Sequence, residues 1–392
     1  MLTTLAVENY RSLRSLVLPL HQLTLITGAN GSGKSSVYRS LRLLADAARN
    51  GAVAALAREG GLPSTLWAGP EKIGRSVREG QHPVQGTVRS KPVALRLGFA
   101  GDEFGYAIDL GLPNDPKSAF SLDPVIKRES VWRGPILRPA TLLADRVAAG
   151  VRSRDESGAW SSTADAIRPT DSMLSEYADP RRQPELLLTR ERIRSWRFYD
   201  QFRTDANAPA RTSRIGTRTP VLDHEGADLA AALQTIRESG DAQALEIAID
   251  QAFPGSRVTV AVRDGWFELK FRQHGLLRPL GAAELSDGTL RYLLWVAALL
   301  ATRPPELFVL NEPETSLHPE LLPALAALIS TAARKTQVIV VSHADPLIRS
   351  LIATAAELGE EAGTVELVKE FGATSISGQG RLDQPAWHWP TR

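Results

Sequence analysis

Residues 28–36 read Gly-Ala-Asn-Gly-Ser-Gly-Lys-Ser-Ser, and this stretch decides the fold. Its first eight residues match the spacing G-x-x-x-x-G-K-[ST]. The preceding run, 23–27, is rich in Leu and Ile and predicts a strand, while 35–48 has apolar residues at helical spacing. A glycine-rich loop between a strand and a helix is an arrangement that holds phosphate groups.

Each residue type in this loop has a physical role in binding a nucleotide. Glycines open backbone conformations closed to other residues, so that N–H groups can turn inward toward phosphate oxygens. The Lys34 side chain can reach the β- and γ-phosphates, and the Ser35 hydroxyl can hold Mg²⁺. We therefore predict that ATP and Mg²⁺ bind here. The expected loop residues are Gly28, Ala29, Asn30, Gly31, Ser32, Gly33, Lys34, Ser35 and Ser36.

A second polar segment follows a buried strand. Residues 307–319 read LFVLNEPETSLHP, which places Asn311 and Glu312 at the carboxyl edge of a parallel sheet, where ligands bind. Glu312 can there polarise a water molecule near the γ-phosphate. The residue expected at position 311 is an Asp that helps to hold Mg²⁺. Asn311 brings no charge, so metal affinity is weaker or another carboxylate, such as Glu314, helps. The alternative is an acidic turn that ends a core strand.

Two further features stand late in the chain. Residues 285–289, LSDGT, precede a helix, and Ser286 with Gly288 can form an anion site at its N-terminus. A simple helix cap by Ser286 explains the same residues. His343 follows the predicted strand 338–341 and can reach a γ-phosphate oxygen, although a lone histidine is more often a surface or packing residue.

Together these motifs resemble the ABC-type ATPase heads, in particular the RecF/SMC-like and predicted AAA-type bacterial ATPases. The resemblance rests on GANGSGKSS (28–36), LSDGT (285–289), LNEPETSLHP (310–319) and SHAD (342–345), with ENYRSL (8–13) at the start. It covers roughly residues 1–110 and 225–372. It implies a nucleotide held between two heads, and therefore a homodimer that forms around ATP.

The resemblance also implies a role for each matching residue. Ser286 and Gly288 would contact the γ-phosphate across the dimer, and Ser316 would lie in a loop that crosses it. Glu312 would be the base that activates water, His343 the γ-phosphate sensor, and Lys34 the third catalytic residue. Ser35 and Asn311 would hold the metal. Arg11 would approach the nucleotide, and Gln81 and Gln85 are candidates for the family's glutamine.

The expected fold class is α/β. We expect a P-loop NTPase of ABC-ATPase type with a mixed parallel sheet, an antiparallel β subdomain and an inserted, mainly helical or irregular region. Residues 84–112 and 257–276 alternate as antiparallel strands do. The expected divisions are a first ATPase lobe (1–112), an insertion (113–225), the rest of the head (226–377) and a tail (378–392).

Composition narrows the class of protein. The chain has 392 residues, a formal net charge of +2 and no Cys, which excludes disulfides, Cys nucleophiles and Cys-ligated metals. Its longest purely apolar run, 292–301, is half of the roughly 20 residues that a membrane span needs. The first ten residues lack the features of a signal peptide. We expect a cytoplasmic protein that does not act at a membrane.

One segment departs from this neutral balance. Residues 181–218 hold ten Arg and four acidic residues, a local balance of +6. Four aromatic residues are interleaved with the arginines, a mixture that suits stacked bases and phosphates. They are Trp196, Phe198, Tyr199 and Phe202. The segment is a candidate contact for DNA or an effector protein. The alternative is an amphipathic helix over 184–202 that packs its aromatics on the core.

Three functions compete. The first is an ATP-driven switch in DNA repair, recombination or phage defence. The second is a nucleotide-gated protein-binding module with weak or no turnover, which Asn311 favours. The third is a transporter motor, against which the long insertion argues. No long heptad run and no nuclease-like metal cluster is present in the sequence.

Overall fold

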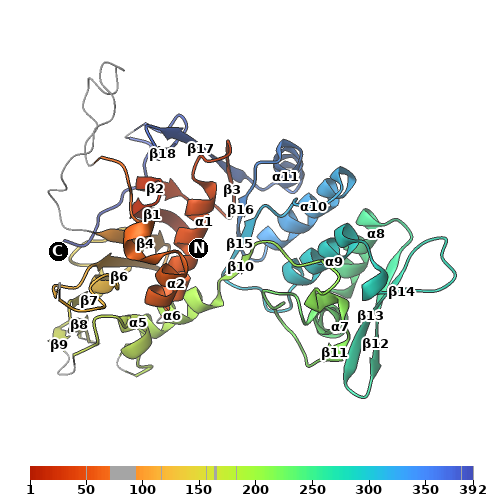
Figure 1. The fold of residues 1–392 in the computed structure, drawn as a ribbon, viewed down its shortest axis with the longest axis horizontal. Coiled ribbons are helices and arrows are strands. Elements are labelled where there is room, and N and C mark those ends of the chain that lie inside the picture. The colour runs from red at the N-terminus through yellow and green to blue at the C-terminus, as the bar shows by residue number, and fades with distance from the viewer. Residues whose placement is uncertain are drawn as a thin grey trace. The chain divides into compact units, whose positions relative to one another are not determined.

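The computed structural model describes residues 1–49, 51–70, 94–115, 117–155, 157–162, 166–181, 183–380 and 382–391. The chain forms two compact units (Figure 1). Unit 1 comprises Met1–Leu20, Gly28–Arg194 and Val365–Arg392, and unit 2 comprises His21–Thr27 and Ser195–Thr364. The domain boundaries predicted at 112, 225 and 377 stay a prediction.

Unit 1 is built on an eight-stranded antiparallel sheet in the order β2-β1-β4-β5-β6-β7-β8-β9. Its strands are β1 (Leu2–Tyr10), β2 (Leu13–Pro19), β4 (Leu95–Gly101), β5 (Phe104–Gly111), β6 (Val125–Arg133), β7 (Leu142–Val147), β8 (Gly150–Arg154) and β9 (Trp160–Ser162). The alternation over 84–112 thus gives β4 and β5 as predicted, and its first ten residues lie outside the described part of the chain.

The helices of unit 1 are α1 (Lys34–Ala47), α2 (Ala52–Arg58), α3 (Gly61–Thr65), α5 (Met173–Glu176) and α6 (Pro184–Ser195), whose last residue belongs to unit 2. Helix α1 contacts β1 and β4. Its buried residues Val37, Leu41 and Leu44 recur every three or four positions, which is why the sequence predicts this helix. Strand β17 (Ala362–Glu370) carries the chain from unit 2 into unit 1 and pairs there with β18 (Ala373–Ile376).

The structure differs from expectation over 125–162, where four strands replace a mainly helical or irregular region. The reason is that charged side chains occupy inward positions of these strands. Glu129 and Arg146 are both fully buried and form an ion pair of 3.1 Å, so the hydrophobic alternation of an ordinary strand is lost. Such burial is tolerated only when the charges are paired and hydrogen-bonded.

Unit 2 centres on parallel strands in the order β10-β15-β16-β3. These are β10 (Arg197–Tyr199), β15 (Leu307–Asn311), β16 (Gln337–Val341) and β3 (Leu23–Gly28), whose last residue opens the phosphate loop in unit 1. A smaller antiparallel sheet holds β11 (Arg214–Ile215), β12 (Arg257–Arg263), β13 (Trp266–Arg272) and β14 (Leu280–Gly281). The hairpin predicted over 257–276 is therefore confirmed.

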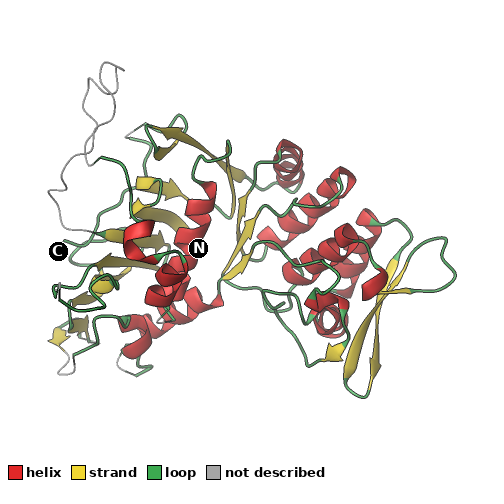
Figure 2. Ribbon diagram, viewed as in Figure 1, coloured by secondary structure: helices red, strands yellow, loops and turns green. Residues whose placement is uncertain are grey.

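The helices of unit 2 are α7 (Leu229–Ser239), α8 (Ala242–Ala252), α9 (Asp287–Leu299), α10 (Leu322–Ala333) and α11 (Asp345–Glu357), with 3₁₀ turns η1 (Pro209–Arg211), η2 (Ala282–Glu284) and η3 (Pro319–Leu321). Figure 2 shows the helices in red and the strands in yellow, and from α9 to α11 helices and strands alternate along the chain. Strand–helix–strand order with parallel pairing is the arrangement that the sequence predicts for this part of the chain.

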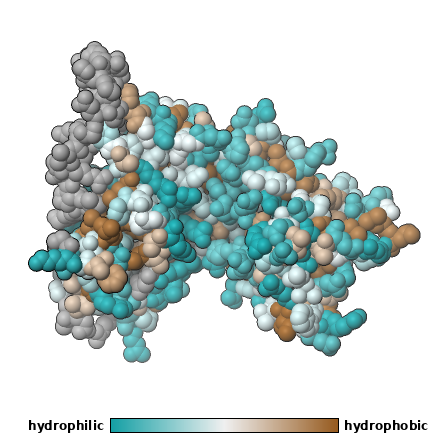
Figure 3. Space-filling view, in the orientation of Figure 1, coloured by the Kyte–Doolittle hydropathy of each residue, from teal (hydrophilic) through white to brown (hydrophobic). Residues whose placement is uncertain are grey.

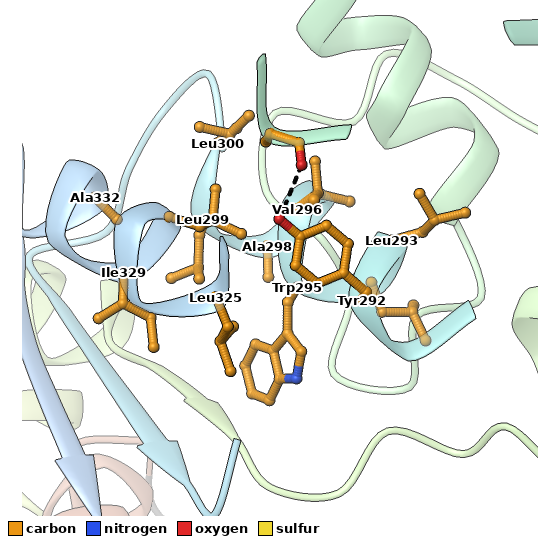
Figure 4. Packing of buried hydrophobic residues seen from close by; sticks show 14 of the residues in the cluster. Tyr292, Leu293, Trp295, Val296, Ala298, Leu299, Leu300, Leu325, Ile329 and Ala332 are labelled. Atoms are coloured by element: carbon orange, nitrogen blue, oxygen red, sulfur yellow. Dashed lines mark hydrogen bonds between the residues drawn. The ribbon is translucent and has the colours of Figure 1, made fainter. Parts of the chain in front are cut away.

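Helix α9 explains the long apolar run of the sequence. Tyr292, Trp295 and Val296 lie in the core of unit 2, where α9 faces Leu325 and Ile329 of α10 (Figure 4). The Tyr292 hydroxyl donates to the Ala248 carbonyl at 2.9 Å, so even its polar end is satisfied. A helix that is apolar all round is a buried helix.

Within the part of the chain that the structure describes, every helix is too short or too polar to cross a lipid bilayer. Hydrophilic residues cover most of the face seen in Figure 3.

We predict that unit 1 depends on the buried carboxylate of Glu129. It accepts hydrogen bonds from the Tyr106 hydroxyl (2.7 Å) and the Ser172 hydroxyl (2.6 Å) as well as from Arg146. Burial, with Glu129 beside it, raises the pKa of Tyr106 well above its usual range, so this hydroxyl remains a donor. Glu129→Ala leaves Arg146 buried without its counter-ion and should lower the free energy of unfolding by about 3–5 kcal/mol in urea denaturation.

The matched control is the exposed pair of Arg133 and Glu185, which are 3.5 Å apart. Arg133→Ala should cost about 1 kcal/mol at most. Equal losses in the two variants would contradict the importance of the buried pair.

Candidate functional site

The phosphate loop has the backbone shape that its glycines predict. Gly28 (φ 138°) and Gly33 (φ 113°) adopt conformations that residues with a side chain rarely reach. A Cβ at Gly28 would also collide with the Leu367 carbonyl, and one at Gly33 with the Thr374 hydroxyl. Both positions therefore require glycine, for space as well as for conformation.

Lys34 and the loop around it are held from within unit 1. The Lys34 ammonium is buried and donates to the carbonyls of Gly28 (2.6 Å) and Ala29 (3.0 Å). The Thr374 hydroxyl donates to the Ser32 carbonyl (2.7 Å) and shares a hydrogen bond with the Ser12 hydroxyl (2.8 Å). The crest of the loop, Ala29 to Gly31, is exposed, as is Ser35. The predicted loop residues thus form one continuous cradle at the start of α1.

Arg11 is paired within unit 1, and its approach to the nucleotide stays a prediction. Its guanidinium donates to the carboxylate of Glu59 at 2.6 Å, and the Tyr10 hydroxyl donates to the same oxygen. Arg11 itself has a φ of 49°, in the left-handed region.

The structure brings Glu312 and His343 together, as their places at neighbouring strand ends predict. Glu312 follows β15 and His343 follows β16, and His343 Nδ1 lies 3.4 Å from Glu312 Oε1. The two side chains are 38% and 47% exposed, so both can reach a ligand. Glu312 has a φ of 47°, which is costly for a residue with a side chain, and its N–H donates to the Val341 carbonyl at 2.7 Å.

A buried carboxylate lies next to this pair. Glu314 is 8% exposed, its Oε1 accepts from the Ser342 hydroxyl at 2.6 Å, and the same oxygen lies 3.8 Å from His343 Nδ1. The Ser342 N–H in turn donates to the Ile26 carbonyl of β3. Glu314 therefore faces β16 and holds the segment that carries His343.

Ser286 caps α9, as the simpler interpretation of LSDGT requires. Its hydroxyl accepts from the Thr289 N–H at 3.2 Å, and the side chain is exposed. Gly288 lies close to the backbone of Ser316, because a Cβ built on it would sit 3.5 Å from the Ser316 carbonyl. Ser316 is exposed and has a φ of 62°. The signature turn and the loop predicted to cross the dimer are thus neighbours within one chain.

Arg211 holds the approach to the signature turn, although no sequence feature predicts it there. Its guanidinium donates to the carbonyls of Ala282 (3.1 Å), Ala283 (3.3 Å) and Leu285 (2.8 Å), and to the Asp287 carboxylate (2.6 Å). The same side chain donates to the Thr204 carbonyl at 2.9 Å. Arg211 therefore fixes the backbone that leads into the signature turn.

Arg291 was missed as well, and it links the signature helix to two other segments. Its guanidinium donates to the carbonyls of Thr315 (2.7 Å) and Phe202 (3.0 Å), and to the Thr204 hydroxyl (3.1 Å). Burial lowers the pKa of Arg291, although an arginine remains charged. No local sequence signal marks either arginine, because their partners lie far along the chain.

The aromatic residues of 181–218 are core residues, which corrects the base-stacking interpretation. Trp196, Phe198, Tyr199 and Phe202 are each at most 7% exposed. The alternative of packing is right about their burial, although the helix ends at Ser195 and two of the aromatics lie in β10. Many of the arginines have internal partners, among them Arg192 with Glu103 and Arg203 with Asp205.

The family's glutamine stays unassigned from the sequence, because Gln81 and Gln85 lie outside the described residues. Gln201 comes two residues after β10, the strand next to β15, and is exposed. Its place beside the acidic strand end makes it a candidate.

We predict that Arg211→Ala loosens the signature turn. Three main-chain carbonyls just before the turn lose a charged donor, and such hydrogen bonds contribute about 1.5–3 kcal/mol. Amide hydrogen exchange over 285–290 should therefore become about tenfold faster or more.

The control for this variant is Arg203→Ala, which removes an exposed pair from the same segment. It should leave exchange over 285–290 unchanged. Unchanged exchange in Arg211→Ala would show that the turn is held by other contacts.

Three solved structures are similar to the chain. The crystal structure of an SMC head bound to the C-winged-helix domain of ScpA matches with a TM-score of 0.50 and 15% identity, over 96% of each chain. The SMC head domain of Thermotoga maritima matches with a TM-score of 0.44 and 13% identity, over 96% of this chain and 97% of that chain. The SMC head with an extended coiled coil from Pyrococcus furiosus, bound to the C-terminal domain of ScpA, gives 0.47 and 12%, over 96% and 95%. The first of these matches, with the SMC head bound to ScpA, confirms the predicted fold class.

None of the curated proteins compared with the chain matches it. A family model does match, over residues 23–350, which include the phosphate loop, the signature turn, the acidic strand end and His343. The family is described as "AAA domain, putative AbiEii toxin, Type IV TA system". With that match and the fold of an SMC head, the chain belongs to this family of AAA-domain ATPases.

Proposed function

We propose that the chain binds and hydrolyses ATP with Mg²⁺ and dimerises around the nucleotide, as an ATP-driven switch of RecF/SMC-like type. The observation that carries this proposal is the pair of Glu312 and His343, 3.4 Å apart at the end of β15 and β16. The next strand, β3, continues directly into the phosphate loop.

In the proposed function, the phosphate loop binds the phosphates of ATP. Its N–H groups and Lys34 hold the β- and γ-phosphates, and the start of α1 adds the partial positive charge of a helix N-terminus. Ser35 and Asn311 would hold Mg²⁺, which supplies positive charge to the phosphate oxygens during transfer. Asn311 suits a cation because its Oδ1 is buried and has no hydrogen-bond partner among the described residues.

In the proposed function, Glu312 and His343 act in the hydrolysis of ATP. We assign Glu312 to accept a proton from the attacking water, since its carboxylate is exposed enough to meet that water. His343, at hydrogen-bonding reach of the same carboxylate, is placed to contact a γ-phosphate oxygen. Glu314 and Ser342 keep His343 at this point of the strand end.

The exposed signature turn supports dimerisation. Ser286 and Ser316 are exposed, lie on neighbouring segments and can face a second copy. In the proposed dimer, Ser286 and Gly288 of one copy contact the γ-phosphate bound by the other, and Ser316 lies in the crossing loop.

We place this switch in the cytoplasm, because a chain without Cys suits a reducing compartment. DNA repair, recombination and phage defence are the proposed settings. The family description names a toxin of a toxin–antitoxin system, which supports work with a partner protein more than a role as a transporter motor.

We predict that Glu312→Gln lowers the steady-state rate of ATP hydrolysis by about 10²–10⁴-fold, the usual loss when a general base is removed. ATP binding should persist, because the phosphate loop is unchanged. Size-exclusion chromatography should then show an ATP-dependent dimer of the variant.

Lys34→Ala is the matched control, since it removes phosphate binding and should abolish both hydrolysis and the dimer. A Glu312→Gln variant that stays monomeric with and without ATP would refute the dimer.

The second candidate is a nucleotide-gated protein-binding module with weak or no turnover, and the missing charge at Asn311 favours it. A steady-state ATPase assay separates the two. Rapid turnover that is lost in Lys34→Ala excludes the module, whereas tight ATP binding without turnover supports it.

A contact with DNA or with an effector through 181–218 remains part of the proposal, and it now depends on exposed arginines instead of aromatics. Arg214 and Arg218 are exposed in unit 2.

If both contact phosphates, changing them to Ala should reduce the slope of log affinity against log salt by about 2 in fluorescence anisotropy with duplex DNA. Arg203→Ala, whose charge is paired with Asp205, is the control and should change the slope little. Undetectable binding to duplex and single strands at low salt would exclude DNA and leave a protein partner.

A further inference from the structure

A carboxylate that no sequence motif marks directly follows β10, the strand next to β15. Strands β10 and β15 are parallel, with Arg197 opposite Phe308, Phe198 opposite Val309 and Tyr199 opposite Leu310. The next residues are Asp200, directly after β10, and Asn311, the last residue of β15. The register therefore places these two residues side by side at the carboxyl edge of the sheet.

Asp200 and Asn311 are in direct contact. Asn311 Nδ2 donates to Asp200 Oδ1 at 2.8 Å. An ionised carboxylate can only accept hydrogen bonds, so the amide must turn its NH₂ group toward Asp200. The Asn311 carbonyl oxygen, Oδ1, consequently points away from Asp200.

That amide oxygen is left without a partner. Asn311 Oδ1 is buried and accepts no hydrogen bond from any described residue. A buried acceptor without a donor is costly unless a ligand satisfies it. Asp200 is exposed and forms no ion pair with Lys or Arg in the described ranges. An unpaired carboxylate beside an unsatisfied oxygen is an arrangement that a cation satisfies.

The other nearby carboxylate, Glu314, lies across β15 from Asp200, although its Oε2 is likewise buried without a hydrogen-bond partner among the described residues. Glu314 lies on the β16 side of β15, where it accepts from the Ser342 hydroxyl and approaches His343. Asp200 lies on the opposite side, next to Asn311 itself. Mg²⁺ in nucleotide sites is held by one or two carboxylates together with phosphate oxygens and water, so a single displaced carboxylate suffices.

We propose that Asp200 supplies the carboxylate of the Mg²⁺ site in place of the Asp that position 311 lacks, with the Asn311 amide oxygen as its neighbouring acceptor. This assignment rests on the proposed binding of Mg²⁺ and ATP. In this assignment, the negative charge that position 311 lacks is supplied from the end of the adjacent strand, β10.

The test is the effect of Mg²⁺ on the equilibrium affinity for a non-hydrolysable ATP analogue, measured by isothermal titration calorimetry with Mg²⁺ and with EDTA. In the unchanged chain Mg²⁺ should tighten binding. Asp200→Asn keeps an acceptor for Asn311 and removes only the charge. The factor by which Mg²⁺ raises the affinity for the analogue should fall by about 10–100-fold in this variant, the usual effect of altering groups around a metal. The affinity measured in EDTA should stay the same.

The exchange variant that combines Asp200→Asn with Asn311→Asp returns the carboxylate to β15 and should restore most of the Mg²⁺ effect. Asp205→Asn, an exposed carboxylate on the same segment, is the control and should behave as the unchanged chain.

Two results would overturn the assignment, and they differ from each other. If Mg²⁺ tightens binding equally in Asp200→Asn and in the unchanged chain, Asp200 is no part of the metal site, while the proposed function stands. If the unchanged chain binds no ATP analogue even in EDTA, the proposed function fails and the metal site fails with it.

Discussion

The parallel pairing of β15, with β10 on one side and β16 on the other, determines where the polar groups of unit 2 lie. Because parallel strands end at the same edge of the sheet, the residues that follow them lie close together although they are far apart in the sequence. Asp200, Glu312 and His343 follow β10, β15 and β16, and each of the three has a partner on an adjacent strand end. A shift of register by one residue would turn these side chains to the other face of the sheet.

The segment that follows β10 connects this edge to the signature turn. Arg291 reaches Phe202 and Thr204 from the signature helix, and Arg211 reaches Thr204 as well as the backbone before Ser286. Arg211 and Arg291 thus connect residues 202–204 with the signature turn and with α9, the helix that begins there. Hydrogen bonds from charged donors are about twice as strong as neutral ones, so this stretch restrains the signature turn more than an ordinary loop would. Much of the basic character of 181–218 therefore serves internal structure.

The features that the sequence predicted correctly are local, and those it missed depend on distant pairing. The phosphate loop is contiguous, so its spacing alone identifies it, and Glu312 and His343 each follow a strand with a clear apolar run. Strand β10 has three residues and pairs with β15 more than a hundred positions later, so nothing local indicated that Asp200 ends a strand. The buried charges of β6 and β7 hid those strands for a related reason. From the sequence alone, charged residues such as Glu129 and Arg146 are expected at the surface, because their pairing in the core is visible only in the structure.

The role proposed for Asp200 bears on the choice between a switch that hydrolyses ATP and a module that only binds it. The argument for weak turnover is the absence of a charge at position 311. Neighbouring strands lie about 4.8 Å apart, a distance that one side chain spans, so a carboxylate on β10 can serve a cation beside β15. With Asp200 in contact with Asn311, the strand end keeps a carboxylate in addition to Glu312. With that carboxylate, position 311 alone gives no reason to expect a weak metal site, and the proposal of ATP turnover rests on Glu312 and His343, which lie 3.4 Å apart.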